Sequence, residues 1–340
     1  MKYARYVLAV AILILVIVVL TTNTQEGPYV KIAGFTQGTS YHMTYQSPSA
    51  DTLDLKTEID ALLADFDQSL STYIDTSNIS RINKNETQET DAYFEAVYNE
   101  ARRIYDSSDG AFDITVGPLI DAWGFGPGRK MEMNEVVIDS LLSFVGMDKV
   151  RIENGKVIKE IPDLRFDLNA IAQGYAVDVV CDYLETKKID NYMVEIGGEL
   201  RTKGLSARGD SWRVGIDKPF YGNSLPGQNL QAVVSLSGEA LASSGNYRKY
   251  YEVDGKKIVH TIDPRTGYTK MSELLSVTII CKECMTADAL ATTCMSLGLE
   301  KAKEFIGRQE DVEALFIFSD QDGLYVEWMT EGMKAFIQEN

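Results

Sequence analysis

Three short turns between strand-like segments constrain the fold of this 340-residue chain more than any other feature. The dipeptides Asn154-Gly155, Asp254-Gly255 and Asp322-Gly323 each separate two runs of apolar, β-branched or aromatic residues. Asn-Gly and Asp-Gly are typical of two-residue β-hairpin turns. Because a hairpin pairs its strands antiparallel, the pattern argues against a doubly wound parallel sheet.

Between these hairpins, apolar residues recur at helical spacing. Helices are predicted over residues 51–66, 91–105, 133–145, 171–184, 287–297 and 299–307. Further strands are predicted over 38–45, 165–167, 192–196 and 276–281. Helices mixed with antiparallel hairpins predict an α+β fold with mixed or antiparallel sheets and packed helices. No tandem repeat or long linker interrupts the body, so residues 31–340 are expected to form one domain.

The N-terminus has the composition of a targeting segment. Lys2 and Arg5 precede an unbroken apolar run from Val7 to Leu20, which is typical of a signal peptide or a short membrane anchor. No clear small-x-small cleavage site follows, which favours an uncleaved signal-anchor over residues 1–22, with 23–30 as a linker. No cysteine follows the run either, which argues against lipid modification. We expect the body on the periplasmic side of a bacterial inner membrane.

Charge and cysteine content narrow the function classes. With 33 Lys+Arg against 50 Asp+Glu, the net charge is −17, which argues against nucleic acid as a partner. Cys281 and Cys284 have CxxC spacing, but no second Cys or His pair accompanies them, so a strand ending in a turn is favoured over a zinc site. GxGxxG and HExxH are absent, which argues against a Rossmann fold and a zinc protease.

Glycine and acidic residues cluster in four segments: 109–126, 167–178, 242–267 and 286–293. The glycines of the first segment allow close backbone approach, although a plain turn would also use them. The second segment runs into a helix whose N-terminus could bind phosphate. Asp167 near that terminus is either part of such a site or an N-cap.

The last two segments contain candidate catalytic groups. His260 is one of only two histidines and is a candidate base or nucleotide contact, although a lone histidine on a strand is often structural. Asp288 and Thr292 are four residues apart and therefore share one helix face. Their oxygens could hold Mg²⁺, the alternative being that Asp288 caps the helix and Thr292 bonds back to its backbone.

The order of these segments resembles the ApbE family of FAD:protein FMN transferases, over about three quarters of the chain. The resemblance rests on Gly38-Thr39-x-Tyr41, Ser71-Thr72-Tyr73 followed by Ser77 and Asn83, Gly110-Ala111-Phe112-Asp113-x-Thr115-Val116-Gly117-Pro118-Leu119, Trp123-Gly124-Phe125-Gly126, Asp167-Leu168-x-Ala170-Ile171-Ala172-x-Gly174-Tyr175, Ile196-Gly197-Gly198-Glu199, Ser243-Ser244-Gly245-x-Tyr247, His260-x-Ile262-Asp263-Pro264-Arg265-Thr266-Gly267 and Ala287-Asp288-x-x-x-Thr292.

The resemblance implies an ApbE-like fold, related to the T-fold, with a flavin cleft. It implies Mg²⁺ ligands at Asp288, Thr292 and the carbonyl of Ala170, with a further contact near Ala291, and a base at His260. The implied contacts to FAD, the substrate, are Gln37, Tyr73, Ala111, Phe112, Asp113, Asp167, Gln173 and Ile262. Two of these depart from the family pattern, since Gln173 stands where Lys is frequent and Gln37 where Met is common.

The reaction so implied is transfer of FMN from FAD to a threonine hydroxyl of a target protein, with release of AMP. The family's targets are exported or membrane-bound redox subunits, which agrees with an N-terminal anchor. Two alternatives stay open. Some relatives hydrolyse FAD to FMN and AMP with the same metal site, and a non-catalytic flavin-binding module would use a similar cleft.

Overall fold

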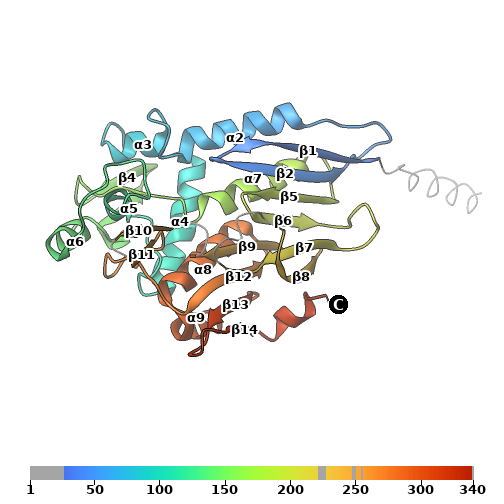
Figure 1. The fold of residues 1–340 in the computed structure, drawn as a ribbon. Coiled ribbons are helices and arrows are strands. Elements are labelled where there is room, and N and C mark those ends of the chain that lie inside the picture. Colours follow the sequence, from blue (N-terminus) through green and yellow to red (C-terminus); the bar gives the residue numbers. More distant parts are fainter. Residues whose placement is uncertain (1–26, 221–226, 247–249, 254–255, 339–340) are drawn as a thin grey trace, which may run out of the picture.

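An eight-stranded antiparallel sheet organises the chain (Figure 1). The computed structural model describes residues 27–220, 227–246, 250–253 and 256–338. The strand order is β1 (Tyr29–Thr36), β2 (Thr39–Gln46), β5 (Tyr192–Ile196), β6 (Glu199–Lys203), β9 (Ala240–Gly245), β12 (Leu274–Cys281), β13 (Glu313–Ser319) and β14 (Tyr325–Met329). Every pairing between neighbours is antiparallel, which confirms the predicted α+β class.

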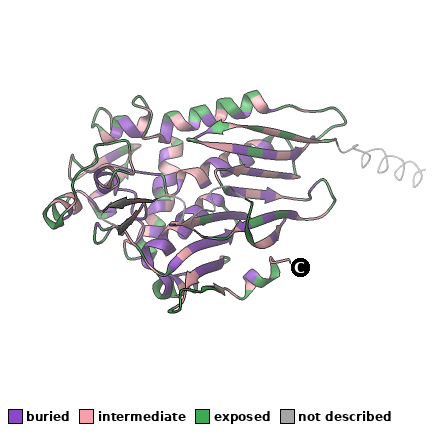
Figure 2. Cartoon of the chain, viewed as in Figure 1, coloured by how far each residue is buried: buried purple, intermediate pink, exposed green. Residues whose placement is uncertain are grey.

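Helices cover one face of this sheet. The main core lies between the strands and α2 (Lys56–Leu70), α4 (Ala92–Ser107), α7 (Ala172–Thr186), α8 (Cys284–Leu297) and α9 (Leu299–Ile306). Figure 2 shows α2 with an exposed outer side and a buried inner side, as its apolar spacing requires. The shorter helices are α3 (Asn78–Asn83), α5 (Gly117–Trp123) and α6 (Glu135–Leu142).

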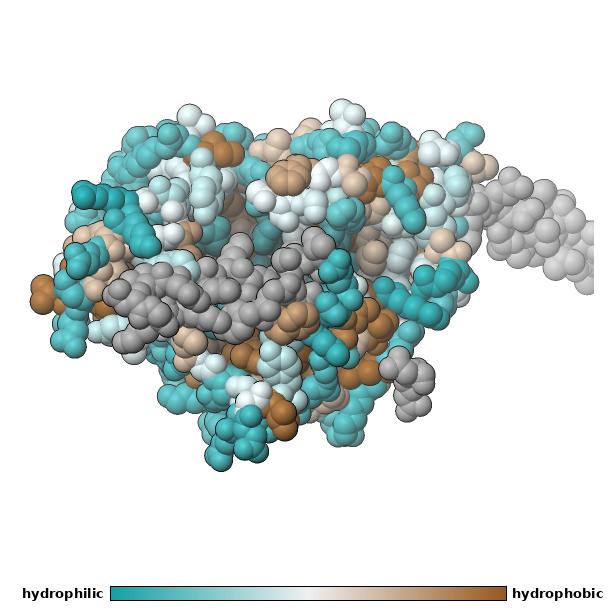
Figure 3. Space-filling model, in the orientation of Figure 1, coloured by the Kyte–Doolittle hydropathy of each residue, from teal (hydrophilic) through white to brown (hydrophobic). Residues whose placement is uncertain are grey.

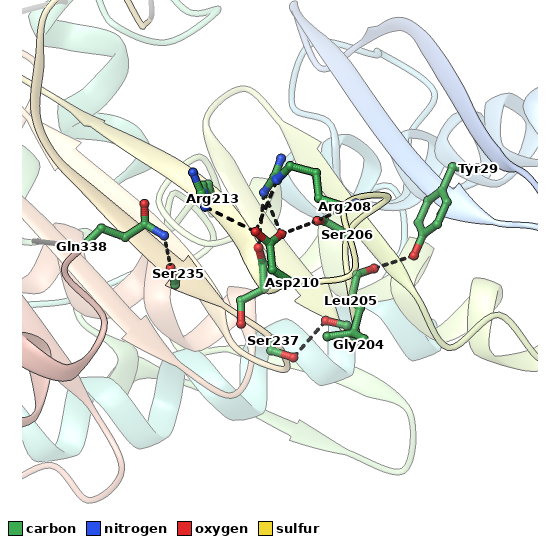
Figure 4. A network of polar contacts seen from close by, with 11 residues as sticks. Tyr29, Gly204, Leu205, Ser206, Arg208, Asp210, Arg213, Ser235, Ser237 and Gln338 are labelled. Atoms are coloured by element: carbon green, nitrogen blue, oxygen red, sulfur yellow. Dashed lines mark hydrogen bonds and ion pairs between the residues drawn. The ribbon is translucent and has the colours of Figure 1, made fainter. Parts of the chain in front are cut away.

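The opposite face is covered only in part. The two-stranded ribbon β7 (Trp212–Asp217) and β8 (Leu230–Leu236) packs with the C-terminal turn η2 (Gly332–Ala335) over β6, β9, β12 and β13. Polar contacts attach the ribbon, and the β6–β7 loop that precedes it, to the two ends of the described chain (Figure 4). The Tyr29 hydroxyl donates to the Leu205 carbonyl at 2.8 Å, and the Gln338 amide donates to Ser235 at 2.6 Å. The face in Figure 3 is mostly hydrophilic, with separate apolar patches.

Most local predictions are confirmed. The hairpin around Asn154-Gly155 is formed by β3 (Val150–Glu153) and β4 (Lys156–Lys159), and β13 pairs with β14. β10 (Tyr250–Val253) pairs with β11 (Lys256–Val259), while the Asp254-Gly255 turn lies outside the described residues. Cys281 ends β12 and Cys284 begins α8, and all four cysteines are buried free thiols.

Two expectations at the level of secondary structure are not met. The strand predicted over 165–167 is wrong, because only Arg165 forms an isolated bridge, with Val116. The backbone of Phe166 instead exchanges two hydrogen bonds with the side chain of Asn83, at 2.7 and 2.9 Å, so no strand ladder forms there. β1 begins at Tyr29, inside the segment expected to be a linker.

The predicted anchor, residues 1–22, lies outside the described residues. Within the part of the chain that the structure describes, no helix combines the length and the apolar character needed to cross a bilayer.

Candidate functional site

At the centre of the predicted site, each of two helices has its N-terminus capped by an aspartate of the other helix. Asp288 of α8 accepts a hydrogen bond at 3.0 Å from the amide of Gly174, in the first turn of α7. Asp178 of α7 accepts hydrogen bonds from the amides of Cys284 and Met285, the first two residues of α8, at 3.0 and 2.8 Å. Neither helix has a side-chain cap at its own N-cap position, so each caps the other.

This exchange decides one alternative left open by the sequence. Asp288 lies in the second turn of α8 and caps α7, 114 residues away in sequence, rather than its own helix. The back-bonding hydroxyl belongs to Thr293, which donates to the Ala289 carbonyl at 2.7 Å. The Thr292 hydroxyl lies 3.1 Å from the hydroxyl of Ser244 on β9. Asp288 and Thr292 therefore use their side chains toward neighbouring elements.

The close crossing of α7 and α8 depends on Gly174. A Cβ at this position would lie 2.3 Å from the carbonyl oxygen of Cys284 and 2.8 Å from Cβ of Asp288. Any other residue at this position would push the two helices apart. The close packing of α7 against α8 therefore explains why position 174 is glycine. Ala170 lies two residues ahead of the start of α7, the helix whose first turn Asp288 contacts.

The donor set at this crossing fits a hard cation. Asp288 is buried, and burial raises its pKa to about 7, because the charged form loses its hydration. A bound cation would restore the ionised form. The hydroxyl of half-buried Thr292 and the carbonyl of half-buried Ala170 are also oxygen donors, as Mg²⁺ requires. The side chain of Ala291 is fully buried, so only its backbone has a polar atom to offer.

Among the described residues, no group of three or more His, Cys, Asp or Glu is placed to hold a metal ion. The expected Mg²⁺ site has a single carboxylate, and hydroxyl and carbonyl oxygens complete it.

Asp167, five residues ahead of α7, lies close enough to Tyr73 for its charge to act on the phenol. The buried carboxylate of Asp167 accepts from the amide and the side chain of Asn169, at 3.0 and 3.1 Å, so Asp167 does not cap α7. Burial raises its pKa to about 6, and the charge of Asp121 adds to the shift. The Tyr73 side chain is 63% exposed. Partial desolvation of its hydroxyl is the main cause of its raised pKa, and the charge of Asp167 is the second. Tyr73 therefore offers a ring face to a ligand near Asp167.

The segment from Ala111 to Asp113 is buried. Asp113 accepts from the amide and hydroxyl of Thr115, at 2.7 and 2.6 Å, and from the amide of Met147 at 3.2 Å. Burial raises its pKa to about 6. Its carboxylate thus holds the fold of the segment, and Ala111 and Phe112, also buried, offer mainly backbone groups. The amide of Asp167 donates to the Ile114 carbonyl at 2.8 Å, which joins the two predicted segments.

His260 follows β11 and is half-buried, with its ring edge-on to Phe125 at a centroid distance of 6.3 Å. The next residue, Thr261, donates to the side chain of Asn246 at 2.8 Å. Asn246 is two residues beyond Ser244, the partner of Thr292, so these contacts link the histidine segment to α8 through the end of β9. Ile262 is buried in a small core with Val116, Leu119 and Val145.

The two glutamines that depart from the family pattern both adjoin turns of the sheet. Gln37 lies in the β1–β2 turn at φ +50°, and both polar atoms of its amide are buried without a hydrogen bond of good geometry. Burial raises the pKa of Asp67, and the nearby amide of Gln37 offsets part of that rise. Such a poorly paired amide fits a site where a ligand supplies a better partner. Gln173 lies over Gly197 in the β5–β6 turn, with its amide nitrogen 2.6 Å from where a Cβ of Gly197 would be.

Sequence reasoning missed the positioning groups Asp178, Asn83 and Asp121 as parts of the site. Asp178 was visible only as one acid on a predicted helix, and nothing local indicates that its partners lie 106 and 107 residues away. Asn83 and Ser244 belong to the quoted motifs, but their contacts follow only from the fold.

Fold and site together define an α+β protein with a polar site built where two helix N-termini cross at one side of an antiparallel sheet. Residues 37–316 match the ApbE family. The FAD:protein FMN transferase of Vibrio cholerae is 39% identical over 315 residues, which cover 91% of this chain and 92% of the relative. The enzyme of the same name from Escherichia coli K12 is 35% identical, with 90% and 88% covered.

Solved structures agree with these sequence relatives. The flavin transferase ApbE from Vibrio cholerae superposes with a TM-score of 0.80 at 36% identity, covering 91% of this chain and 99% of that one. The apo form of the Pseudomonas stutzeri flavinyl transferase ApbE gives a TM-score of 0.81 at 31% identity, with 93% and 98% covered. This chain belongs to the ApbE family, which confirms the predicted resemblance and its fold.

Proposed function

We propose that this chain transfers FMN from FAD to a threonine hydroxyl of a target protein, with Mg²⁺ bound at the helix crossing and AMP released. Family membership supports the transfer of FMN from FAD to a protein, since the relatives that cover about nine tenths of the chain are named for it. The observation that carries the site assignment is the hydrogen bond between Asp288 and Gly174, because it brings the one buried carboxylate of α8 to the start of α7.

In this proposal, Asp288, Thr292 and the Ala170 carbonyl hold Mg²⁺, with a further backbone contact near Ala291. When bound, the cation neutralises the negative charge of the FAD diphosphate and of the departing phosphate. The N-terminus of α7, which begins at Ala172, adds its dipole in the same direction. This side of the site therefore stabilises charge on phosphate oxygens.

The flavin side of the site positions the other half of FAD. Tyr73 offers its exposed ring to the isoalloxazine, and the buried amide of Gln37 gains partners when a ligand with both donor and acceptor atoms is bound. Asp167, Gln173, Ile262 and the 111–113 segment complete the expected contacts. The orientation of the flavin fixes where the FMN phosphorus lies relative to His260.

His260 acts as the general base. It takes the proton of the threonine hydroxyl as the oxygen forms a bond to the FMN phosphorus, and the bond from that phosphorus to the bridging oxygen breaks. The bridging oxygen leaves with AMP. The product is a phosphoester between FMN and threonine, so atoms and charge balance without a further reactant.

The compartment follows from the sequence. An N-terminal signal-anchor would hold the body at the outer side of a bacterial inner membrane, where an exported or membrane-bound redox subunit could serve as acceptor.

The test is incubation of the full chain with FAD, Mg²⁺ and an acceptor subunit of such a redox complex. We expect AMP release that stops when Mg²⁺ is chelated, and an FMN adduct that mass spectrometry places on threonine. An acceptor with that threonine changed to valine is the matched control. Free FMN without an adduct would favour the FAD diphosphatase, because water and threonine would attack the same phosphorus. Flavin binding without AMP release would favour a non-catalytic module.

A further inference from the structure

The loop that follows α5 is folded around a single carboxylate, that of Asp121. Its Oδ1 accepts from the amide of Gly128 at 2.8 Å, and its Oδ2 pairs with the guanidinium of Arg165 at 3.0 Å. A Cβ at Gly126 would lie 2.3 Å from Oδ1, and one at Gly128 would lie 2.3 Å from Cγ. The Asp121 side chain is only 14% exposed, so the loop encloses it on several sides.

The same loop contacts His260 through the side chain of Phe125. The Phe125 ring lies edge-on to the imidazole of His260 at 6.3 Å and against the ring of Tyr251 at 5.3 Å. The Tyr251 hydroxyl donates to the Trp123 carbonyl at 2.7 Å, and the ammonium of Lys130 lies 3.6 Å from the centre of the Tyr251 ring. These contacts join the loop to the β10–β11 hairpin, at the end of which His260 lies.

The loop is also fixed at its base, where the Trp123 indole donates to the Gly267 carbonyl at 2.8 Å. Movement of residues 124–128 relative to that base therefore depends on the contacts inside the loop. Among these, the hydrogen bond from Gly128 closes the loop onto the helix that precedes it. The amide of Phe125 also donates to the Ile120 carbonyl at 3.0 Å, so loss of the acceptor at position 121 would loosen residues 126–128 and shift the ring of Phe125 against the imidazole without releasing it.

We infer that Asp121 is a positioning residue for His260, acting through the Phe125 loop. This inference rests on the proposed function only in taking His260 as the base. The essential property of Asp121 is the oxygen that accepts from Gly128, so an asparagine can replace it while an alanine cannot.

The test compares Asp121→Ala with Asp121→Asn in the full chain, by two measurements. The chain has two histidines, so each of the two C–H positions of the imidazole ring, Cδ2 and Cε1, gives two signals in a ¹H–¹³C spectrum of histidine-labelled protein. His42 lies on β2, paired with Glu195 at 2.9 Å, and serves as the internal reference. We expect Asp121→Ala to shift or broaden the His260 signal and leave His42 unchanged, and Asp121→Asn to restore the parent position.

The second measurement is transfer to the acceptor. Because a misplaced group costs about 100-fold for a displacement of 1 Å, Asp121→Ala should lower kcat by roughly tenfold to 100-fold, with a smaller change in KM for FAD. Gly128→Ala approaches the same contact from the other side and should reproduce both effects. Asp139→Ala, an exposed change of equal charge on α6, is the control.

An unchanged His260 signal in folded Asp121→Ala and Gly128→Ala would overturn the inference, as would an Asn variant that behaves like the Ala variant. If the parent transfers no FMN, the proposed function fails, while the His260 signal still decides whether Asp121 positions this ring.

Discussion

Gly174→Ala is the most direct test of the helix crossing that brings Asp288 to α7. The added Cβ would lie 2.3 Å from the Cys284 carbonyl oxygen, 2.7 Å from its carbon and 2.8 Å from Cβ of Asp288. Two of these atoms are backbone, which no rotamer change can move. The helices must therefore separate at the point where Asp288 accepts from the amide of residue 174.

The cost follows from two opposing terms. Overpacking costs 1–3 kcal/mol, and a clash with backbone belongs at the upper end, at about 3 kcal/mol. Alanine gains about 1 kcal/mol over glycine inside a helix. The net loss is about 2 kcal/mol, which lowers the melting temperature by roughly 3 °C, because the unfolding entropy is about 2.1 cal/mol/K per residue and the chain has 340 residues. Because α8 carries Asp288 and Thr292, a shift near 1 Å should also lower transfer by about 100-fold.

The assay is thermal unfolding followed by circular dichroism, together with Mg²⁺-dependent AMP release. Gly307→Ala is the matched control, since Gly307 ends α9 at φ −62° and is exposed, with no atom nearer than 3.3 Å to an added Cβ. It should be neutral or slightly stabilising. A Gly174→Ala chain that melts with its parent and keeps full activity would show that the close approach of the helices has no role.

Four further changes test individual residues of the site. Asp288→Ala should abolish Mg²⁺-dependent AMP release while circular dichroism shows a folded chain, and full activity would exclude Asp288 as a ligand. His260→Ala should reduce transfer more than FAD affinity in titrations, whereas equal losses would make it a binding residue. Gln173→Lys should lower the Kd for FAD, and added salt should shrink the gain if the new charge is its cause. The folded pKa of Asp113 is raised from 3.8 to about 6, so the parent loses up to ~3 kcal/mol of stability as the pH rises from about 4 to 6, whereas Asp113→Asn does not. The unfolding free energy of the variant relative to its parent should therefore increase over that range, and a pH-independent difference in urea melts would contradict this.

The secondary structure that the sequence predicts best is the part with local causes. The Asn154-Gly155 turn needs positive φ at both residues, and both have it, at +52° and +72°. The strand over 192–196 and the helices α4 and α7 were predicted to within two residues of their ends. Apolar residues at every second position of a strand, or at helical spacing, indicate that one face is buried. The strand β5 and the helices α4 and α7 each bury one face.

Prediction failed where a contact from far along the chain decides the conformation. Residues 165–167 have the composition of a strand, but the side chain of Asn83 takes both hydrogen-bonding groups of Phe166. The Asp288 and Thr292 pair was recognisable from its spacing, whereas the contacts of Ser244 and Asp178 were not, since their partners come from other elements. The spacing of residues along one helix can be read from a single sequence. Which residues of other elements they contact is decided by tertiary packing and cannot.

At the helix crossing, two aspartates are enough to cap both helices, because each caps the N-terminus of the other helix. Each helix N-terminus has unpaired amides and a positive dipole, and here each receives a carboxylate from the other helix. The guanidinium of Arg201, 2.9 Å from Asp178, balances the charge of one of these carboxylates. Asp288 makes no ion pair in the described chain, and burial raises its pKa. In the proposed function, Mg²⁺ would be the partner of the second carboxylate, and the contact between Asp288 and Gly174 would fix where it binds.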